Sequence, residues 1–243
     1  MNKQAELSAL VDYHKPQIVA ITETWLNDSI KFSAFSNDYN VYRCDRKNAR
    51  GGGVLLAVKS NLQCKFVESF SLNNCECLFL DILLDSSNYM RYGIIYRPPD
   101  TNYNDSLTLY NKIYSLVENV KHYTLLGDFN IPDIDWKYLT AHSNIGREFL
   151  TFCFKIGAIQ LVDFPTRLDS LIDLLLCSDR NFVKSVYSDM PFSTSDHNIV
   201  ICELLCLKDI KIENIVRPCF QKADFNLINA FLGTLNWDEI YLN

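Results

Sequence analysis

Short apolar runs separated by polar stretches are the main pattern along the chain. Each run is five to eight residues long and is apolar at nearly every position, which is typical of strands covered on both faces. The pattern therefore predicts a core rich in β-sheet. The predicted strands are residues 18–22, 54–58, 77–84, 92–96, 123–127, 171–177 and 198–205.

A second pattern, with apolar residues three or four positions apart, predicts three helices among the first 207 residues. In the first helix Leu7, Leu10 and Val11 share one face, and Pro16 ends the pattern. The expected limits are residues 4–14 for the first helix, a cap at Asn104 or Asp105 for the second, and a start at Ser143 or Asn144 with a stop at Gly157 for the third.

Several predicted strands follow one another with no helix between them. This order favours an α/β (α+β) fold of packed mixed sheets with helices outside over a simple alternating parallel fold. After Leu207 the chain becomes polar, so we predict one domain over residues 1–207 and a linker with a C-terminal helix over 208–243. That helix would dock weakly or pack on a missing neighbour through an inward face of Phe225, Ile228, Phe231 and Leu232.

Composition narrows the class of protein. The 243 residues are 48% hydrophobic, enough for a sizeable core, yet no apolar run approaches the roughly 20 residues that cross a bilayer. We therefore expect no membrane partner. None of the nine cysteines forms a CxxC pair, and several lie in apolar runs. We predict reduced thiols and an intracellular location, in the nucleus or the cytoplasm.

The net charge of −6 argues against nucleic-acid binding by the surface as a whole. One segment, YRCDRKNARGGG, is locally basic through Arg43, Arg46, Lys47 and Arg50. It predicts either a local nucleic-acid contact or a solvated hairpin with a flexible turn, and the sequence leaves both open.

Polar residues that could take part in catalysis lie where the apolar runs end or begin. Glu23, Tyr96 and Asp128 each close a run or follow one directly, with Asn130 two residues further on. His197 stands just before the last predicted strand. If that strand runs antiparallel to the others, all these groups meet at one edge of the sheets. Taken singly, Glu23 could cap a turn and Asp128 could form an Asx turn.

Together these groups indicate phosphate chemistry. Gathered carboxylates repel one another unless a cation or a proton compensates them. Oxygen ligands without paired Cys or His favour Mg²⁺ (or Mn²⁺) over zinc. Asp173, inside an apolar run, needs a partner, and His197 is available. An Asp–His pair beside a carboxylate-held metal suits hydrolysis of a phosphate ester.

The segments ITETW, IYRPP, LGDFN, IDLLL and SDH, in this order, resemble the endonuclease/exonuclease/phosphatase superfamily. With GGGV and FPTR, the chain is most similar to the apurinic-type endonuclease domain of non-LTR retrotransposons, over about residues 5–205. The resemblance implies a DNase-like four-layer sandwich, in which two packed mixed sheets are flanked by helices.

The resemblance also implies a role for each matching residue. The implied catalytic group holds and activates the scissile phosphate and the attacking water, and two carboxylates hold the metal. The catalytic group is Tyr96, Asp128, Asn130, Asp173 and His197, and the metal ligands are Glu23 and Asp196. As DNA-contacting residues we predict Arg43, Arg46 and Arg50 of the basic segment, together with Thr166, Arg167 and Ser195.

Members of this family begin with a strand that ends in a metal-binding asparagine, and they continue into a reverse transcriptase. Here Met1 directly precedes the first predicted helix, so we expect the chain to lack that strand, and we expect a reverse transcriptase domain as a partner outside the chain. The predicted function is metal-dependent nicking of a DNA phosphodiester. Two alternatives stay open: an inactive retrotransposon-derived remnant, and a phosphatase of the same superfamily.

Overall fold

A computed structural model describes residues 3–30, 32–35, 37–47, 49–84, 88–205 and 224–235. The chain divides into two compact units, Met1–Ile210 and Lys211–Asn243, each of which is described by itself. The predicted boundary between residues 207 and 208 stays a prediction.

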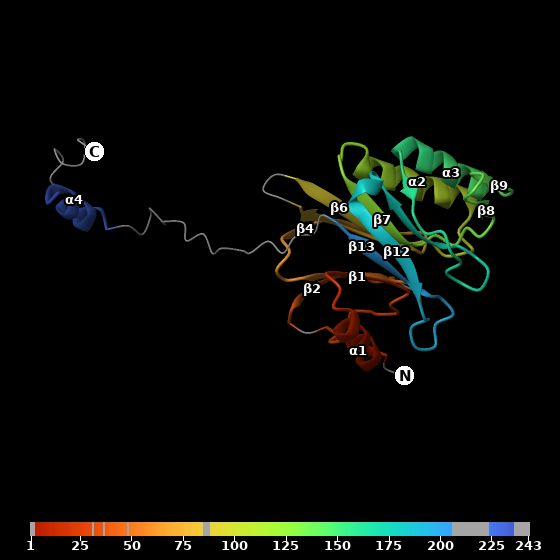
Figure 1. The fold of residues 1–243 in the computed structure, drawn as a ribbon, viewed down its shortest axis with the longest axis horizontal. Coiled ribbons are helices and arrows are strands. Elements are labelled where there is room, and N and C mark those ends of the chain that lie inside the picture. The colour runs from red at the N-terminus through yellow and green to blue at the C-terminus, as the bar shows by residue number, and fades with distance from the viewer. Residues whose placement is uncertain are drawn as a thin grey trace. The chain divides into compact units, whose positions relative to one another are not determined.

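The first unit contains a six-stranded sheet in the order β10-β11-β7-β6-β5-β4 (Figure 1). β6 and β7 are parallel and every other pair in this sheet is antiparallel, so the sheet is mixed, as predicted. Its strands are β4 (Cys64–Leu72), β5 (Cys75–Leu83), β6 (Tyr89–Tyr96), β7 (Tyr123–Asp128), β10 (Ile159–Gln160) and β11 (Asp173–Cys177).

A second β layer faces this sheet. It consists of a three-stranded sheet in the order β1-β3-β2 and of the hairpin β12-β13, and the described pairings in it are antiparallel. A small β8-β9 pair precedes α3. The strands are β1 (Ile18–Thr22), β2 (Tyr39–Cys44), β3 (Val54–Lys59), β8 (Ile134–Asp135), β9 (Thr140–Ala141), β12 (Val183–Asp189) and β13 (Ile199–Leu204), with a short 3-10 helix at Arg180–Phe182.

Helices cover the outer faces of these two layers and complete the four-layer arrangement (Figure 1). α2 (Tyr103–Val117) and α3 (Asn144–Ile156) pack on the six-stranded sheet, and α1 (Gln4–His14) packs on the layer that holds β1. α3 has the predicted limits. The predicted cap of α2 is wrong, because the side chain of Asn102 accepts a hydrogen bond from the Asp105 amide and starts the helix earlier.

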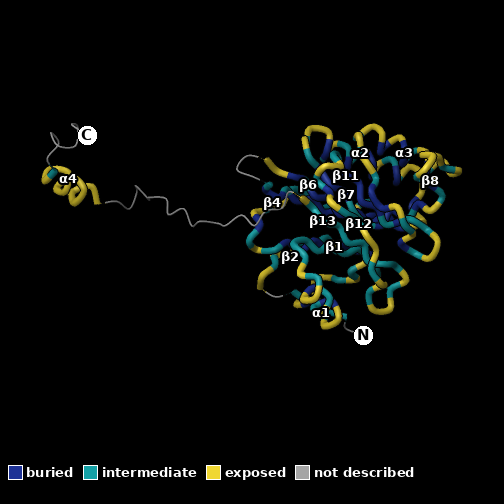
Figure 2. The backbone as a smooth tube through the Cα atoms, in the orientation of Figure 1, coloured by how far each residue is buried: buried dark blue, intermediate teal, exposed yellow. Residues whose placement is uncertain are grey.

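Alternation along β5 builds the two halves of the core. Leu78, Leu80 and Ile82 face β3 and the inner layer, whereas Cys77 and Phe79 face α2 and α3. All five side chains are fully buried, as the dark tube through the central strands indicates (Figure 2). No disulfide joins the described cysteines. The centre of the six-stranded sheet is therefore a rigid support for residues at its edge.

In the second unit, α4 (Phe225–Gly233) begins at an Asp224 cap and contains no buried residue. Phe225, Ile228, Phe231 and Leu232 are each 37% exposed or more, and the packing of this face on a missing neighbour stays a prediction. The predicted linker lies largely outside the described residues. Within the described ranges, no helix is long and apolar enough to cross a membrane.

Candidate active site

Four polar residues form one row across four neighbouring strands. Asp173 at the start of β11 is the register partner of Asp128 at the end of β7, and Asp128 is the partner of Tyr96 at the end of β6. Tyr96 is in turn opposite Glu76 at the start of β5. Partners across a sheet point to the same face, so these side chains gather on the face toward the second β layer.

His197 completes this row from the other layer. Its Nδ1 atom lies 2.8 Å from Oδ2 of Asp173, and the segment bridges to Arg167 just before β13. One ligand atom each from Asp128, Asp173 and His197 lies within 4.8 Å of the others. The structure thus brings together residues that are 69 positions apart along the chain, counted from 128 to 197.

Local backbone features place Asp128 at this edge. Gly127 has a φ of +133°, and a Cβ atom there would lie 2.0 Å from the carbonyl oxygen of Ile95 on β6. Only glycine allows that close approach. Beyond Asp128, Asn130 has a left-handed φ of 49°, and its backbone and side-chain amides donate to the two oxygens of Asp128 at 3.0 and 2.7 Å.

The buried side chain of Arg97 stabilises the turn at residues 128–130. Its side chain is fully buried and donates to the carbonyl oxygens of Phe129 and Asn130, to that of Thr101, and to the hydroxyl of Ser106 at the start of α2. The carbonyl of Arg97 accepts from the Asn130 amide at 3.1 Å. Arg97 was not predicted as a site residue, although it stands in IYRPP, because its burial is visible only in the fold.

Burial raises the pKa of Asp128 to about 7, and the neighbouring charge of Asp173 adds to the rise, while His197 and the Asn130 amides act in the opposite direction. The hydrogen bond that the His197 ring donates to Asp173 raises the pKa of His197, against the effect of burial. The site therefore pairs a carboxyl that exchanges its proton near neutral pH with an imidazole that favours its charged form. Such a pair can act as a proton acceptor and a hydrogen-bond donor side by side.

Replacing Asp173 with asparagine is expected to lower the pKa of His197, because the charged hydrogen-bond partner is lost and burial then dominates. An NMR titration of the His197 ring in metal-free protein measures this change. Asp135→Asn, which removes an exposed carboxylate at the end of β8, serves as the control. An unchanged His197 pKa in Asp173→Asn would contradict the assigned pairing.

Glu23 approaches the same row from the end of β1. The hydroxyl of Tyr96 donates to Oε1 of Glu23 at 2.5 Å, and the indole N–H of Trp25 donates to Oε2 at 3.0 Å. Burial and this hydrogen bond raise the pKa of Tyr96. The hydrogen bond to Asp196 raises the pKa of Arg167, and Asp128 and Glu23 add to the rise through their charges. The charges of Asp128 and Glu23 therefore both act on the Arg167 guanidinium.

The donor set fits a hard divalent cation. Asp128 and Asp173 supply carboxylate oxygens and His197 supplies one nitrogen within 4.8 Å of one another, with no thiolate among them, and Glu23 reaches the row through its hydrogen bond with Tyr96. Each Glu23 oxygen accepts one hydrogen bond and keeps a lone pair for a ligand. Asp196 instead pairs with Arg167 at 2.7 Å and is exposed, and the Arg167 hydrogen bond lowers its pKa.

Of the predicted DNA-contacting residues, some are buried or paired with other residues of the protein and others are exposed. Thr166 is fully buried, and its hydroxyl accepts from the amides of Ile172 and Asp173, so its place beneath the site corrects the prediction of a substrate contact. Arg46 pairs with buried Glu76, and Ser195 accepts from the His197 amide. Arg43 pairs with Asp45. Arg50 lies over the Trp25 ring, and Arg167 forms a β-bridge with His197 and pairs with Asp196.

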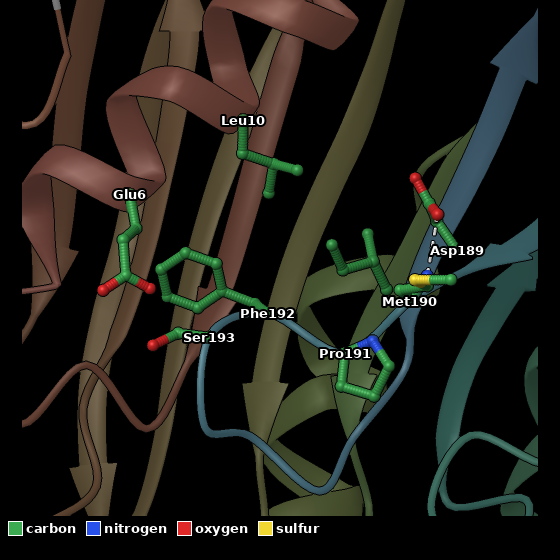
Figure 3. Close-up of a pocket in the computed structure, with 8 residues that line it drawn as sticks. Glu6, Leu10, Asp189, Met190, Pro191, Phe192 and Ser193 are labelled. Carbon is green, nitrogen blue, oxygen red and sulfur yellow. Dashed lines mark hydrogen bonds between the residues drawn. The ribbon is translucent and has the colours of Figure 1, made fainter.

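A separate cavity of about 250 Å³ lies between α1 and the connection from β12 to β13. Leu10 and Phe192 line it, and in Figure 3 the Phe192 ring extends toward the helix. None of the site residues above lines this cavity. The acidic row therefore lies apart from this cavity.

Comparison with known proteins agrees with this geometry. Residues 90–201 match the family described as endonuclease-reverse transcriptase. The fold is similar to an AP endonuclease from Leishmania major (TM-score 0.63, 13% identity, 80% of each chain covered) and to a 3′-5′ exonuclease from Neisseria meningitidis (TM-score 0.63, 18% identity, 83% of this chain and 94% of that chain covered). It is also similar to an AP endonuclease from Archaeoglobus fulgidus (TM-score 0.57, 15% identity, 81% and 92% covered).

At these identities the solved structures show a shared fold. No curated protein sequence matches the chain significantly. The family match covers the segment that carries Tyr96, Asp128, Asp173 and His197. The chain therefore has the fold of these AP endonucleases, and its residues 90–201 are similar to the family described as endonuclease-reverse transcriptase.

Proposed function

We propose that the chain is a metal-dependent DNA endonuclease that nicks a phosphodiester bond, as in target-primed reverse transcription of a non-LTR retrotransposon. The observation that carries the proposal is the row of Tyr96, Asp128 and Asp173, with His197 and Glu23 hydrogen-bonded to its two ends. The family description, endonuclease-reverse transcriptase, supports a reverse transcriptase domain as the partner.

Each group has a distinct part in this reaction. Asp128, with a pKa of about 7, accepts the proton of the attacking water once it is ionised. Asp173 occupies Nδ1 of His197 and leaves Nε2 to donate to a phosphate oxygen. The amide of Asn130 and the hydroxyl of Tyr96 stand beside Asp128 as further donors.

Mg²⁺ or Mn²⁺, when bound, supplies positive charge to the phosphate as it gains negative charge. Glu23 is the ligand we propose for it, with Asp128 and Asp173 as the neighbouring carboxylates. DNA as the substrate is supported by two structural neighbours, one described as bound to a product DNA hairpin and one as complexed with single-strand DNA product. Exposed Arg50 and Arg167 are the proposed phosphate contacts.

Supercoiled plasmid tests the proposal. With Mg²⁺, the chain is expected to convert plasmid to the nicked circle, to stop when EDTA is added, and to leave a 3′-hydroxyl that a DNA polymerase extends. Plasmid that stays intact to the same extent as in a His197→Ala control would reject the proposal and favour the inactive remnant.

A phosphatase is the second candidate, because one structural neighbour is described as a 3′ phosphatase. The same protein is then offered an oligonucleotide with a 3′-phosphate. Release of inorganic phosphate without any nicking would replace the endonuclease proposal with this one.

A further inference from the structure

Glu76 is a fully buried carboxylate at the start of β5 that the proposed chemistry does not use. It accepts from Nε and Nη2 of Arg46 at 2.9 and 3.0 Å, from the Gly53 amide at 3.0 Å, and from the Ser71 hydroxyl at 3.3 Å. A buried charge is tolerated when it is paired and hydrogen-bonded in this way. Glu76 thereby fixes two points of the hairpin that joins β2 to β3.

The first connection from Glu76 leads to Tyr96. The two residues are opposite each other on β5 and β6, and the Arg46 guanidinium lies 5.6 Å from the centre of the Tyr96 ring. A Cβ atom on Gly52 would lie 2.4 Å from that guanidinium, so glycine is required for this approach. Arg46 therefore spans from Glu76 to the tyrosine whose hydroxyl donates to Glu23.

The second connection leads through the glycines to the segment that carries Glu23. The carbonyl of Gly53 accepts from the Thr24 amide at 3.2 Å, and that of Gly52 accepts from the Trp25 amide at 2.9 Å. Glu23 and Trp25 both have left-handed φ values, 52° and 55°, which persist only where surrounding contacts hold them. The Trp25 indole then donates to the second oxygen of Glu23.

We propose that Glu76 and Arg46 are positioning residues that fix the Glu23 carboxylate and thereby set the divalent-metal affinity of the site. Both hydrogen-bond donors to Glu23, the Tyr96 hydroxyl and the Trp25 indole, are held by segments attached to this buried pair. The proposal rests on the proposed function for the metal. It also assigns Arg46 to support of the site, because its guanidinium is committed to Glu76 and only 11% of the side chain is exposed.

The chain contains a matched control for this pair. Arg91 binds Asp81 through two parallel hydrogen bonds of 2.8 and 2.9 Å, and these residues join the same two strands, β5 and β6, five register positions away from Glu76. Asp81→Asn therefore removes a comparable ion pair without touching the site. Glu76→Gln removes the charge of the proposed anchor at nearly constant volume, and Arg46→Gln removes its partner.

The experiment measures Mn²⁺ binding to the full chain by calorimetry and the ¹⁹F NMR spectrum of metal-free protein labelled with 5-fluorotryptophan. Trp25→Phe assigns the Trp25 signal. We expect Glu76→Gln and Arg46→Gln to weaken Mn²⁺ binding tenfold or more and to shift the Trp25 signal. Asp81→Asn is expected to leave both at wild-type values.

Two outcomes separate this inference from the proposed function. If wild-type protein shows no Mn²⁺ binding that depends on Glu23, as judged against Glu23→Gln, the metal proposal fails while the NMR comparison still tests the anchor. If wild-type protein binds Mn²⁺ and a folded Glu76→Gln or Arg46→Gln variant binds it equally well with an unshifted Trp25 signal, the inference is overturned. Arg46→Gln decides the matter if Glu76→Gln does not fold.

Discussion

Plasmid nicking is expected to fall by about three orders of magnitude or more when His197 is replaced with alanine. The imidazole is held in place by the Asp173 carboxylate, and the hydrogen bond to Asp173 raises its pKa, which favours the charged form that donates to the phosphate. Removing it leaves the developing negative charge on the phosphate without this donor, and it also leaves Asp173 unpaired beside Asp128. The rate of conversion of supercoiled to nicked plasmid at saturating Mg²⁺ measures the effect.

His142→Ala is the control for that loss, since His142 is exposed and its described hydrogen bonds, with Arg147 and Asp133, are made by its backbone. Nicking by this variant should match the wild-type rate. Asp173→Asn should lose less than His197→Ala, because Asp173 acts through the histidine. If folded His197→Ala nicks within tenfold of wild type, His197 is not part of the chemistry.

Asp128→Asn is expected to abolish nicking and yet to increase the free energy of unfolding by about 2 kcal/mol at pH 8 in EDTA. The folded pKa of Asp128 lies at about 7, above its ordinary value of 3.8. Below pH 3.8 the carboxyl is neutral in both states and has no effect. As the pH rises from 3.8 through 7, the unfolded state loses its proton first, so the native state is progressively destabilised. Asparagine removes this penalty, which is complete above pH 7.

Urea unfolding at pH 4 and pH 8 measures that difference, with the gain expected at pH 8 and absent at pH 4. Asp133→Asn provides a control of opposite sign. Although burial acts to raise the pKa of Asp133, hydrogen bonds from Ser143 lower it, so this carboxylate stabilises the fold at pH 8 and loses that effect as the pH falls. An Asp128→Asn variant that is less stable than wild type at pH 8 would contradict the claim that the ionised Asp128 carboxylate destabilises the native state.

The sequence predicted the central strands well, because runs such as 54–58 and 123–127 are buried on both faces and carry no competing pattern. It did not predict β4, whose residues CKFVESFSL alternate irregularly because β4 is an edge strand with a bulge between Phe66 and Glu68. The limits of α3 were predicted because Ser143 and Gly157 are local signals. The start of α2 was not, because three neighbouring residues could each serve as the cap.

The sequence could predict that Asp128, Asp173 and His197 lie close together, because each stands in a recognisable motif beside an apolar run. It could not predict the supporting residues, since their roles depend on burial and on partners far along the chain. Thr166, Arg46 and Glu76 illustrate this: the first two were expected to contact DNA, and Glu76 gave no signal beyond being an acid next to an apolar strand. Only the register of β5 and β6 shows that it stands opposite Tyr96.

The row from Glu76 to Asp173 also links the chemistry of the site to the order in which the chain folds. Side chains in a sheet alternate between faces, so slipping any of β5, β6, β7 or β11 by one residue would turn its member of the row away from the others. The hydrogen bonds of Glu23 with Tyr96 and of His197 with Asp173 form only after the intervening loops have closed. A divalent cation bound by Asp128, Asp173 and His197 would therefore stabilise only molecules in which these strands are already in register.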